Sequence, residues 1–269
     1  MGDCAHTFLY EAGGISALGG VHPHTIPNQP DGTLLLEDIK SAIRAENEHF
    51  PISRLLILEN THNRCGGVSI SRNFTLSAAD VAHQAGLDVH LDGARIFNAA
   101  VDQGRPAAEL VDMVESVTFC LSKGLCAPVG SVLCGSKAFV EKAHRIRKQL
   151  GGGMRQAGVL AAAGVVALEE MVDRLSEDHA HAKALAEGLS AIPGIRLDKG
   201  SPNTNMVYIA LDPETGLDAK RFSDQLRGQG VRAGITGPRH FRLVCHYWIR
   251  GEHIPKIIQA FEAALETSK

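Results

Sequence analysis

The chain has 269 residues, of which 44% are hydrophobic and 21% charged, with a formal net charge of −3 at pH 7. This balance is typical of a folded globular protein with one large domain or two smaller ones, and it excludes a mainly disordered chain. With 27 basic against 30 acidic residues and a longest apolar stretch at 157–168, no nucleic-acid partner and no membrane span of ~18–20 residues is expected.

The first half of the chain predicts a strand–helix–strand alternation. Apolar runs bounded by polar residues predict strands at 54–59, 89–92, 116–121 and 129–134. Helical spacing predicts helices at 75–85 and 107–114. Thr75 or Ser77 is the expected cap of the first helix, and Leu76 lies on its apolar face with two alanines. The alternation favours an α/β fold with a mostly parallel sheet and right-handed crossovers.

The second half of the chain predicts a different arrangement. A basic helix begins near Lys137, and after Gly151-Gly152-Gly153 a long helical segment extends from about 154 to 189, with an alanine-rich first half that we expect to be buried. Further strands are expected at 195–197, 205–211 and 241–245, and helices at 219–229 and 253–266. We therefore expect a large domain at 1–170 and a small C-terminal α/β domain at 171–269.

Six cysteines are spread through the chain without a CxxC pair. Disulfide frameworks usually belong to shorter, secreted chains, so we interpret these residues as free thiols in a reducing compartment. The N-terminus lacks the basic and apolar segments of a signal peptide. A cytoplasmic location is the resulting expectation.

Polar clusters follow three of the predicted strands, at 59–63, 92–95 and 122–123. In parallel sheets, ligands bind beyond the carboxyl ends of the strands. We therefore expect the three clusters to meet at one edge of the sheet and to form the functional site.

Lys123 and Asp92 together indicate pyridoxal chemistry. Lys123 directly follows an apolar strand, and a partly desolvated lysine can attack a carbonyl group to form a Schiff base. Asp92 ends a neighbouring strand, and a pyridoxal cofactor needs such a carboxylate at its ring nitrogen. Taken singly, Lys123 could be a solvated strand end and Asp92 a turn residue.

Four further residues are weaker candidates by themselves. Arg95 could reach the cofactor ring oxygen or a substrate carboxylate, and His62 could stack on the ring or move a proton. His6 is weaker still. Arg242 interrupts an apolar strand and suggests a carboxylate clamp, or else an edge-strand charge.

The glycine triplet at 151–153 is a candidate phosphate site. If it opens a helix, its amides, with Lys148 and Arg155, could hold a phosphate group, although a plain turn between two helices fits equally well. No GxGxxG after a strand, no GxSxG, no Walker loop and no metal-ligand spacing is present in the sequence. These absences disfavour a dinucleotide-binding protein, a serine hydrolase, a nucleoside-triphosphate-binding protein and a metal site.

Five segments resemble the low-specificity L-threonine aldolases, pyridoxal-phosphate enzymes with the aspartate-aminotransferase-like fold (fold type I). The matching segments are LENTHN at 58–63, HLDGARIFN at 90–98, CLSKG at 120–124, APVGS at 127–131 and GGGMRQ at 151–156. The resemblance covers essentially the whole chain and is weakest after about residue 195. It implies cleavage of threonine or allo-threonine to glycine and acetaldehyde, hence a role in threonine catabolism and glycine formation.

The resemblance also implies roles for single residues. Lys123 resembles the Schiff-base lysine, Asp92 the partner of the pyridine nitrogen, and Arg95 the ligand of the ring oxygen. His6 resembles the histidine that stacks on the ring, and His62 the second active-site histidine.

Three basic residues complete the implied site. Arg242 resembles the arginine that binds the substrate carboxylate. Lys148 and Arg155 resemble residues presented to the phosphate of a neighbouring subunit, so a homo-oligomer, dimer or tetramer, is implied.

One departure from the family pattern opens an alternative. Family members carry a longer N-terminal portion with a phosphate-binding loop, so the resemblance implies an N-terminally truncated large domain. The alternative function is therefore a catalytically impaired homologue that acts, if at all, by assembly with other subunits. Another β-eliminating lyase or a transaminase is a third possibility within the same fold.

Overall fold

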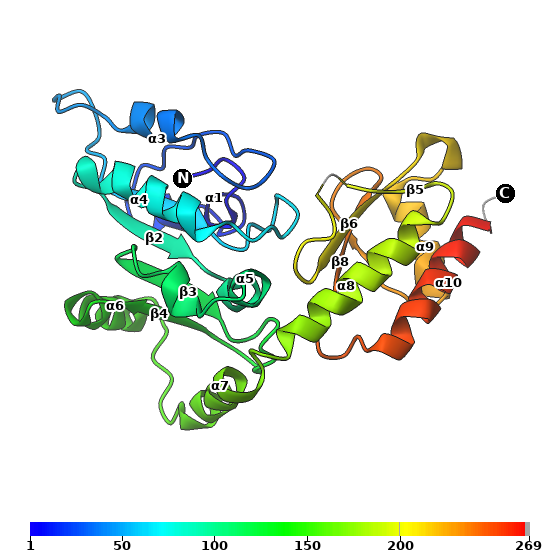
Figure 1. Ribbon diagram of the computed structural model, residues 1–269. Helices are drawn as coiled ribbons and strands as arrows, with labels where there is room; N and C mark the ends of the chain where they lie inside the picture. The colour runs from blue at the N-terminus through cyan, green and yellow to red at the C-terminus, as the bar shows by residue number, and fades with distance from the viewer. Residues whose placement is uncertain (199, 267–269) are drawn as a thin grey trace. The chain divides into compact units, whose positions relative to one another are not determined.

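The computed structural model describes residues 1–198 and 200–266, which form two compact units, Met1–Asp173 and Arg174–Lys269 (Figure 1). Lys199 and residues 267–269, the end of the expected second domain, lie outside the described residues. Each unit has its own sheet and its own hydrophobic core.

The first unit is built on a four-stranded sheet with the order β1-β2-β3-β4. Strands β1 (Leu55–Glu59), β2 (Asp88–Asp92) and β3 (Ser116–Cys120) run parallel, as predicted. Strand β4 (Ser131–Gly135) runs antiparallel to β3, because the short connection at 121–130 leaves no room for a crossover helix. The predicted α/β fold with a mostly parallel sheet is confirmed.

The two faces of this sheet differ in chemistry. One face carries alternate apolar residues, including Leu58, Leu91 and Val117, which pack against α4 (Arg72–Gln84) and α5 (Ile96–Gln103). Helix α3 (Leu36–Ala42) packs on α4. Since side chains alternate along a strand, the other face receives the polar residues between them.

Several predictions for the helices of this unit were wrong. Helix α4 begins at Arg72 rather than at 75, because the Ser71 hydroxyl caps it by accepting a hydrogen bond from Phe74 N. Leu76 is exposed on that helix. Only a 3-10 turn, η1 (Ala107–Leu110), forms within 107–114. Helix α5 and the short helices α1 (His6–Leu9), α2 (Gly14–Ala17) and α3 were not predicted.

The segment after β4 also differs from its prediction. The basic helix α6 (Lys137–Gln149) is present, but the long helix expected at 154–189 is two helices, α7 (Gly158–Glu170) and α8 (Leu175–Ser190). The expected burial of the alanine-rich half is wrong within this chain. On α7, Val159 is 71% exposed and Val165 is 51% exposed, whereas Gly164 and Ala167 are its buried residues.

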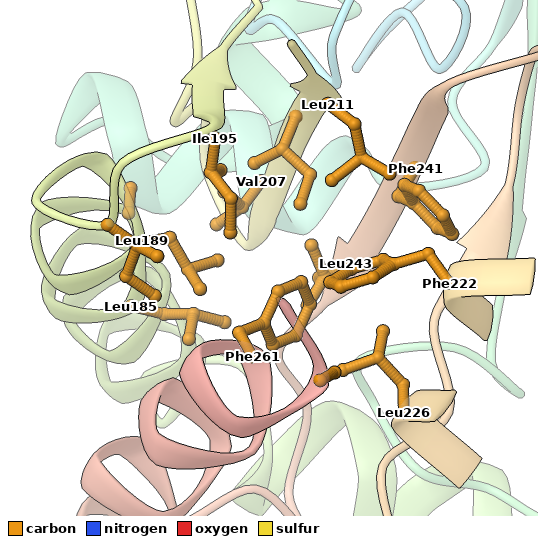
Figure 2. Close-up of a cluster of buried hydrophobic side chains, with 14 of the residues drawn as sticks. Leu185, Leu189, Ile195, Val207, Leu211, Phe222, Leu226, Phe241, Leu243 and Phe261 are labelled. Carbon is orange, nitrogen blue, oxygen red and sulfur yellow. The ribbon is translucent and has the colours of Figure 1, made fainter. Parts of the chain in front are cut away.

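The second unit has an antiparallel sheet with the order β5-β6-β8-β7. Its strands are β5 (Ile195–Leu197), β6 (Met206–Leu211), β8 (His240–Val244) and β7 (Gly234–Ile235), the last of which was not predicted. Its helices and turns are α8, η2 (Pro213–Thr215), α9 (Ala219–Gly228), η3 (Gly251–His253) and α10 (Ile254–Glu266). In its core, the ring of Phe222 lies 5.6 Å from each of the rings of Phe241 and Phe261 (Figure 2).

The six cysteines are all free, as predicted. Across residues 1–198 and 200–266, no helix combines the length and apolar character that crossing a membrane requires.

Candidate active site

The carboxyl ends of the parallel strands bring the predicted polar clusters to one edge of the first sheet. Glu59 of β1 pairs with Asp92 of β2, which in turn pairs with Thr118 of β3. Paired residues of neighbouring parallel strands share a sheet face, so all three side chains lie on the polar face. The edge therefore gathers acidic and hydroxyl groups beside the loops that follow each strand.

Asp92 is held firmly at this edge. The residue is 7% exposed, its Oδ1 accepts a hydrogen bond from Ala94 N at 3.1 Å, and its backbone oxygen accepts one from Asn60 N at 2.9 Å. A buried carboxylate in this position is fixed in orientation before any ligand binds.

The residue after Asp92 must be small. Gly93 N donates to Thr118 O at 2.8 Å, and a Cβ on Gly93 would lie 2.9 Å from that same oxygen. Strands β2 and β3 can therefore converge beyond their paired residues only because position 93 has no side chain.

We expect Gly93→Ala to lower the free energy of unfolding by about 1–3 kcal/mol, the usual cost of forcing a methyl group into a filled space. Urea unfolding measures the change. Gly158→Ala is the matched control, because a Cβ at Gly158 meets nothing within 4 Å. Equal stability of the two variants would contradict the close approach.

Lys123 lies in the tight loop that joins β3 to β4. Its backbone oxygen accepts a hydrogen bond from Cys126 N at 3.0 Å, and Ala127 N donates to Leu121 O at 3.0 Å. At the start of this loop Cys120 N donates to Ala94 O at 3.4 Å, which ties it to the turn after Asp92. Lys123 is half-buried, and it follows the strand that neighbours the one ending in Asp92.

His62 is buried in the loop after β1, with 1% of its surface exposed. Its Nδ1 accepts a hydrogen bond from Cys65 N at 3.3 Å, which assigns the proton of the neutral ring to Nε2. Burial lowers the pKa of His62, and the nearby charges of Glu59, Asp92 and Asp3 oppose that shift. His62 is thus a neutral histidine whose Nε2 has no hydrogen-bond partner in the described part of the chain.

His6 reaches the same edge through its backbone. His6 N donates to Glu59 Oε2 at 2.7 Å, which anchors the start of α1 to the end of β1. The His6 ring is partly exposed, lies 5.2 Å from the Tyr10 ring, and places Nε2 3.0 Å from Glu11 Oε1.

Arg95 occupies the cap position of α5, three residues after Asp92, and is half-buried. Hydrogen bonds therefore connect, at one edge of the sheet, the segments that carry four of the predicted site residues: Asp92, Arg95, His6 and His62. Of the predicted site residues in the first unit, Lys148 and Arg155 belong to a different segment.

The glycine triplet does not open a helix, which corrects one of the two interpretations of this segment. It follows α6, and α7 begins only at Gly158, so the triplet makes the turn between two helices. A Cβ on Gly153 would lie 2.7 Å from Lys148 Nζ, so the Lys148 side chain lies over the turn. Lys148 and Arg155 are both exposed.

Arg242 belongs to the second unit. It lies on β8, between Tyr208 of β6 and Gly234 of β7, so the alternative of an edge-strand charge is wrong. Phe241 and Leu243 point into the core, and Arg242 therefore lies on the opposite face of that sheet.

The sequence analysis gave no individual role to Glu59, beyond its place in the polar cluster at 59–63, and none to Gly93. Glu59 is a buried carboxylate, 6% exposed, at the last position of an apolar strand. That position could have marked Glu59 as a residue of the site, since a charged residue at the end of a buried strand needs hydrogen-bond or ionic partners. Gly93 gave only the weaker signal of an Asp-Gly turn.

The donor set of this edge fits pyridoxal phosphate. Asp92 is a buried carboxylate suited to a pyridine nitrogen, and Lys123, a half-buried residue in the loop after the next strand, supplies an amine. His62 offers an Nε2 without a hydrogen-bond partner in the described part of the chain. The fold and this set of groups define a fold type I enzyme of the pyridoxal-phosphate-dependent class.

Comparison with known sequences makes the assignment more specific. The model of the beta-eliminating lyase family matches residues 1–212, and the chain belongs to that family. The chain is similar to low-specificity L-threonine aldolase 1 of Arabidopsis thaliana, with 43% identity over 99% of this chain and 75% of the relative. The low specificity L-threonine aldolase of Escherichia coli K12 is 38% identical over 98% of this chain and 76% of its own length.

Solved structures agree on the fold. A threonine aldolase from Leishmania major superposes with a TM-score of 0.80 at 21% identity, over 98% of this chain and 76% of that one. A putative L-allo-threonine aldolase from Listeria monocytogenes gives a TM-score of 0.79 at 20% identity, over 97% and 73%. The resemblance inferred from the sequence motifs is confirmed.

Proposed function

We propose that this protein cleaves L-threonine and L-allo-threonine to glycine and acetaldehyde with pyridoxal phosphate as cofactor. The observation that carries the proposal is the pairing of the strands that end in Asp92 and precede Lys123, in a chain 43% identical to a low-specificity L-threonine aldolase. The alternative of a catalytically impaired homologue is not favoured, because the aldolases match nearly the whole chain.

Each of the residues at the sheet edge would bind a different part of the cofactor. Lys123 would hold it through its amine, Asp92 would pair with the ring nitrogen, and Arg95 would bind the ring oxygen. His6 would stack on the ring. When bound, pyridoxal phosphate supplies an electron-accepting ring for the electron pair released as the Cα–Cβ bond breaks.

His62 acts on the substrate hydroxyl. Because Cys65 N occupies Nδ1, His62 presents an N–H rather than a lone pair at Nε2. Of the two roles open to it, direct base or orientation of a water molecule, this tautomer favours the second. The oriented water takes the hydroxyl proton as the Cβ–O group becomes the aldehyde carbonyl, and return of that proton to Cα completes glycine.

Arg242 is the proposed ligand of the substrate carboxylate, because a guanidinium group binds a carboxylate through two parallel hydrogen bonds. In this proposal the first unit is the cofactor-binding domain. A β-hydroxy-α-amino acid carries the amine, carboxylate and hydroxyl that these residues recognise.

The protein also acts as a homo-oligomer in this proposal, with Lys148 and Arg155 serving the cofactor phosphate of a neighbouring copy. Helix α7 supports it: its valines face solvent in the single chain, and a helix that is apolar all round is normally buried. The proposed location is the cytoplasm.

We expect Val159→Asp to shift the protein toward the monomer, because a carboxylate would have to be buried when α7 is covered. Light scattering after gel filtration measures the mass. Leu18→Asp is the control, since Leu18 is equally exposed, at 71%, but lies outside α7. An unchanged oligomer in the Val159 variant would contradict the role of α7.

Product analysis tests the activity itself. The purified protein, supplied with pyridoxal phosphate and L-threonine, should release acetaldehyde and glycine in equal amounts. Release of a keto acid without aldehyde would indicate another lyase or a transaminase. No turnover of threonine, allo-threonine or phenylserine would overturn the proposed function.

A further inference from the structure

Glu59 carries a charge that the mechanism above does not use. The side chain of Glu59 is 5% exposed, and burying a charge is costly unless hydrogen bonds replace the lost water. Two backbone groups supply those bonds: His6 N donates to Oε2 at 2.7 Å, and Asn63 N donates to Oε1 at 2.9 Å. A charged acceptor makes stronger hydrogen bonds than a neutral one, so both contacts are of the strong kind.

We propose that Glu59 is a positioning residue, which holds the two histidines of the active site, His6 and His62, in a fixed relation to the end of β1. The inference rests on the proposed function for the reaction that it serves. It adds a residue to which the sequence analysis gave no role.

The first contact fixes the histidine that is remote in sequence. His6 and Glu59 are 53 positions apart, and α1 begins at His6 without a side-chain cap from Ala5. The first N–H groups of a helix have no partner inside it, and Glu59 supplies one for His6. The start of α1 is therefore attached to the strand that neighbours β2 and its Asp92.

The second contact fixes the loop that carries His62. Asn63 N directly follows His62 and bonds the same carboxylate, while His62 N donates to Val68 O at 2.9 Å. Glu59 Oε2 also lies 3.9 Å from His62 Nε2. The carboxylate thus holds the backbone beside His62 and faces the proton-bearing nitrogen of its ring.

The charge of Glu59 has a measurable consequence for His62. The charged groups facing His62 are Glu59, Asp92 and Asp3, all acidic, and each raises the pKa of His62 against the effect of burial. Removing one of these charges must lower the pKa of His62 further. The Nε2–H tautomer should survive, because the Cys65 N–H bond to Nδ1 does not involve Glu59.

The test uses Glu59→Gln in the holoenzyme, followed by NMR of histidines labelled with ¹³C and ¹⁵N. We expect the pKa of His62 to fall by about one unit, the lower end of the usual effect of an opposite charge at this distance, with the ¹⁵N shifts still reporting Nε2–H. We expect kcat for threonine cleavage to fall about 10–100-fold, the cost of a misplaced catalytic group, with a smaller change in KM. The His62 resonance is assigned by its loss in His62→Gln.

Glu115→Gln is the matched control. Glu115 also accepts a bond from a backbone N–H, that of Val89 at 2.6 Å, and lies 3.1 Å from a histidine ring nitrogen, His83 Nε2. It precedes β3, so it lies at the opposite end of the sheet from the site. We expect kcat and the His62 titration to be unchanged in this variant.

A second variant keeps the inference testable if Glu59→Gln fails to fold. Glu59→Asp retains the charge but is one methylene shorter, so it cannot reach both N–H groups. We expect kcat to fall while the His62 titration stays near that of the wild type. Wild-type kcat in Glu59→Asp, or unchanged kcat and titration in Glu59→Gln, would overturn the positioning role. Failure of the wild type to cleave threonine would overturn the proposed function instead, and the NMR titration would still test Glu59.

Discussion

Lys123→Ala should reduce acetaldehyde release from threonine by at least about 10³-fold, because it removes the amine that we propose binds the cofactor covalently. Lys123 is half-buried in the loop after β3. Strand β3 is the neighbour of β2, which ends in Asp92. The loop is held by its own backbone bonds, so the truncation should leave the fold intact.

Borohydride reduction of the holoenzyme gives a readout independent of activity. In the wild type, mass spectrometry of a digest should find the reduced cofactor on the peptide that contains Lys123. Lys142→Ala is the matched control, because Lys142 is an exposed lysine of α6. Cofactor found on another lysine, or full activity of the Lys123 variant, would refute the assignment.

The sequence predicted the strands of the first sheet better than its helices. Short, largely apolar segments bounded by polar residues identified β1, β2 and β3 to within one residue at each end. Helix α4 starts earlier than predicted because Ser71, not Thr75, is the cap. Propensity does not distinguish two hydroxyl residues four positions apart, and the difference is decided by tertiary packing.

Burial was harder to predict than element type. The alanine- and valine-rich sequence of α7 indicated a buried helix, yet Val159 and Val165 are exposed in the chain. An apolar helix is normally buried, either against the rest of its own chain or against another copy of the chain. A single sequence cannot distinguish the two cases.

The site was predictable where strand ends determine it. Asp92 and Lys123 follow neighbouring parallel strands, and the topology alone brings their segments to one edge. The hydrogen bonds that His6 N and Asn63 N donate to Glu59 were not predictable from the sequence. His6 and Glu59 are 53 positions apart, and local sequence patterns do not indicate contacts over that separation.

Asp92→Asn is expected to lower kcat about 10²–10³-fold, the usual cost of removing a preorganised electrostatic group from an active site. The substitution keeps the shape of the side chain, and the amide oxygen can still accept the bond from Ala94 N. What it removes is the negative charge that, in the proposed function, would keep the ring nitrogen of the cofactor protonated. We expect the covalent attachment to Lys123 to persist, since that bond does not depend on the charge of Asp92.

Steady-state kinetics with threonine, combined with the borohydride experiment, separates these two effects. Asp88→Asn is the matched control, because Asp88 begins the same strand and shares the sheet face of Asp92 but is exposed at the opposite end. Asp88 and Asp92 lie at opposite ends of the same face of β2, so a loss confined to Asp92→Asn would tie catalysis to the carboxyl edge of the sheet. Near-normal kcat in Asp92→Asn would mean that the charge at this edge does not serve the reaction.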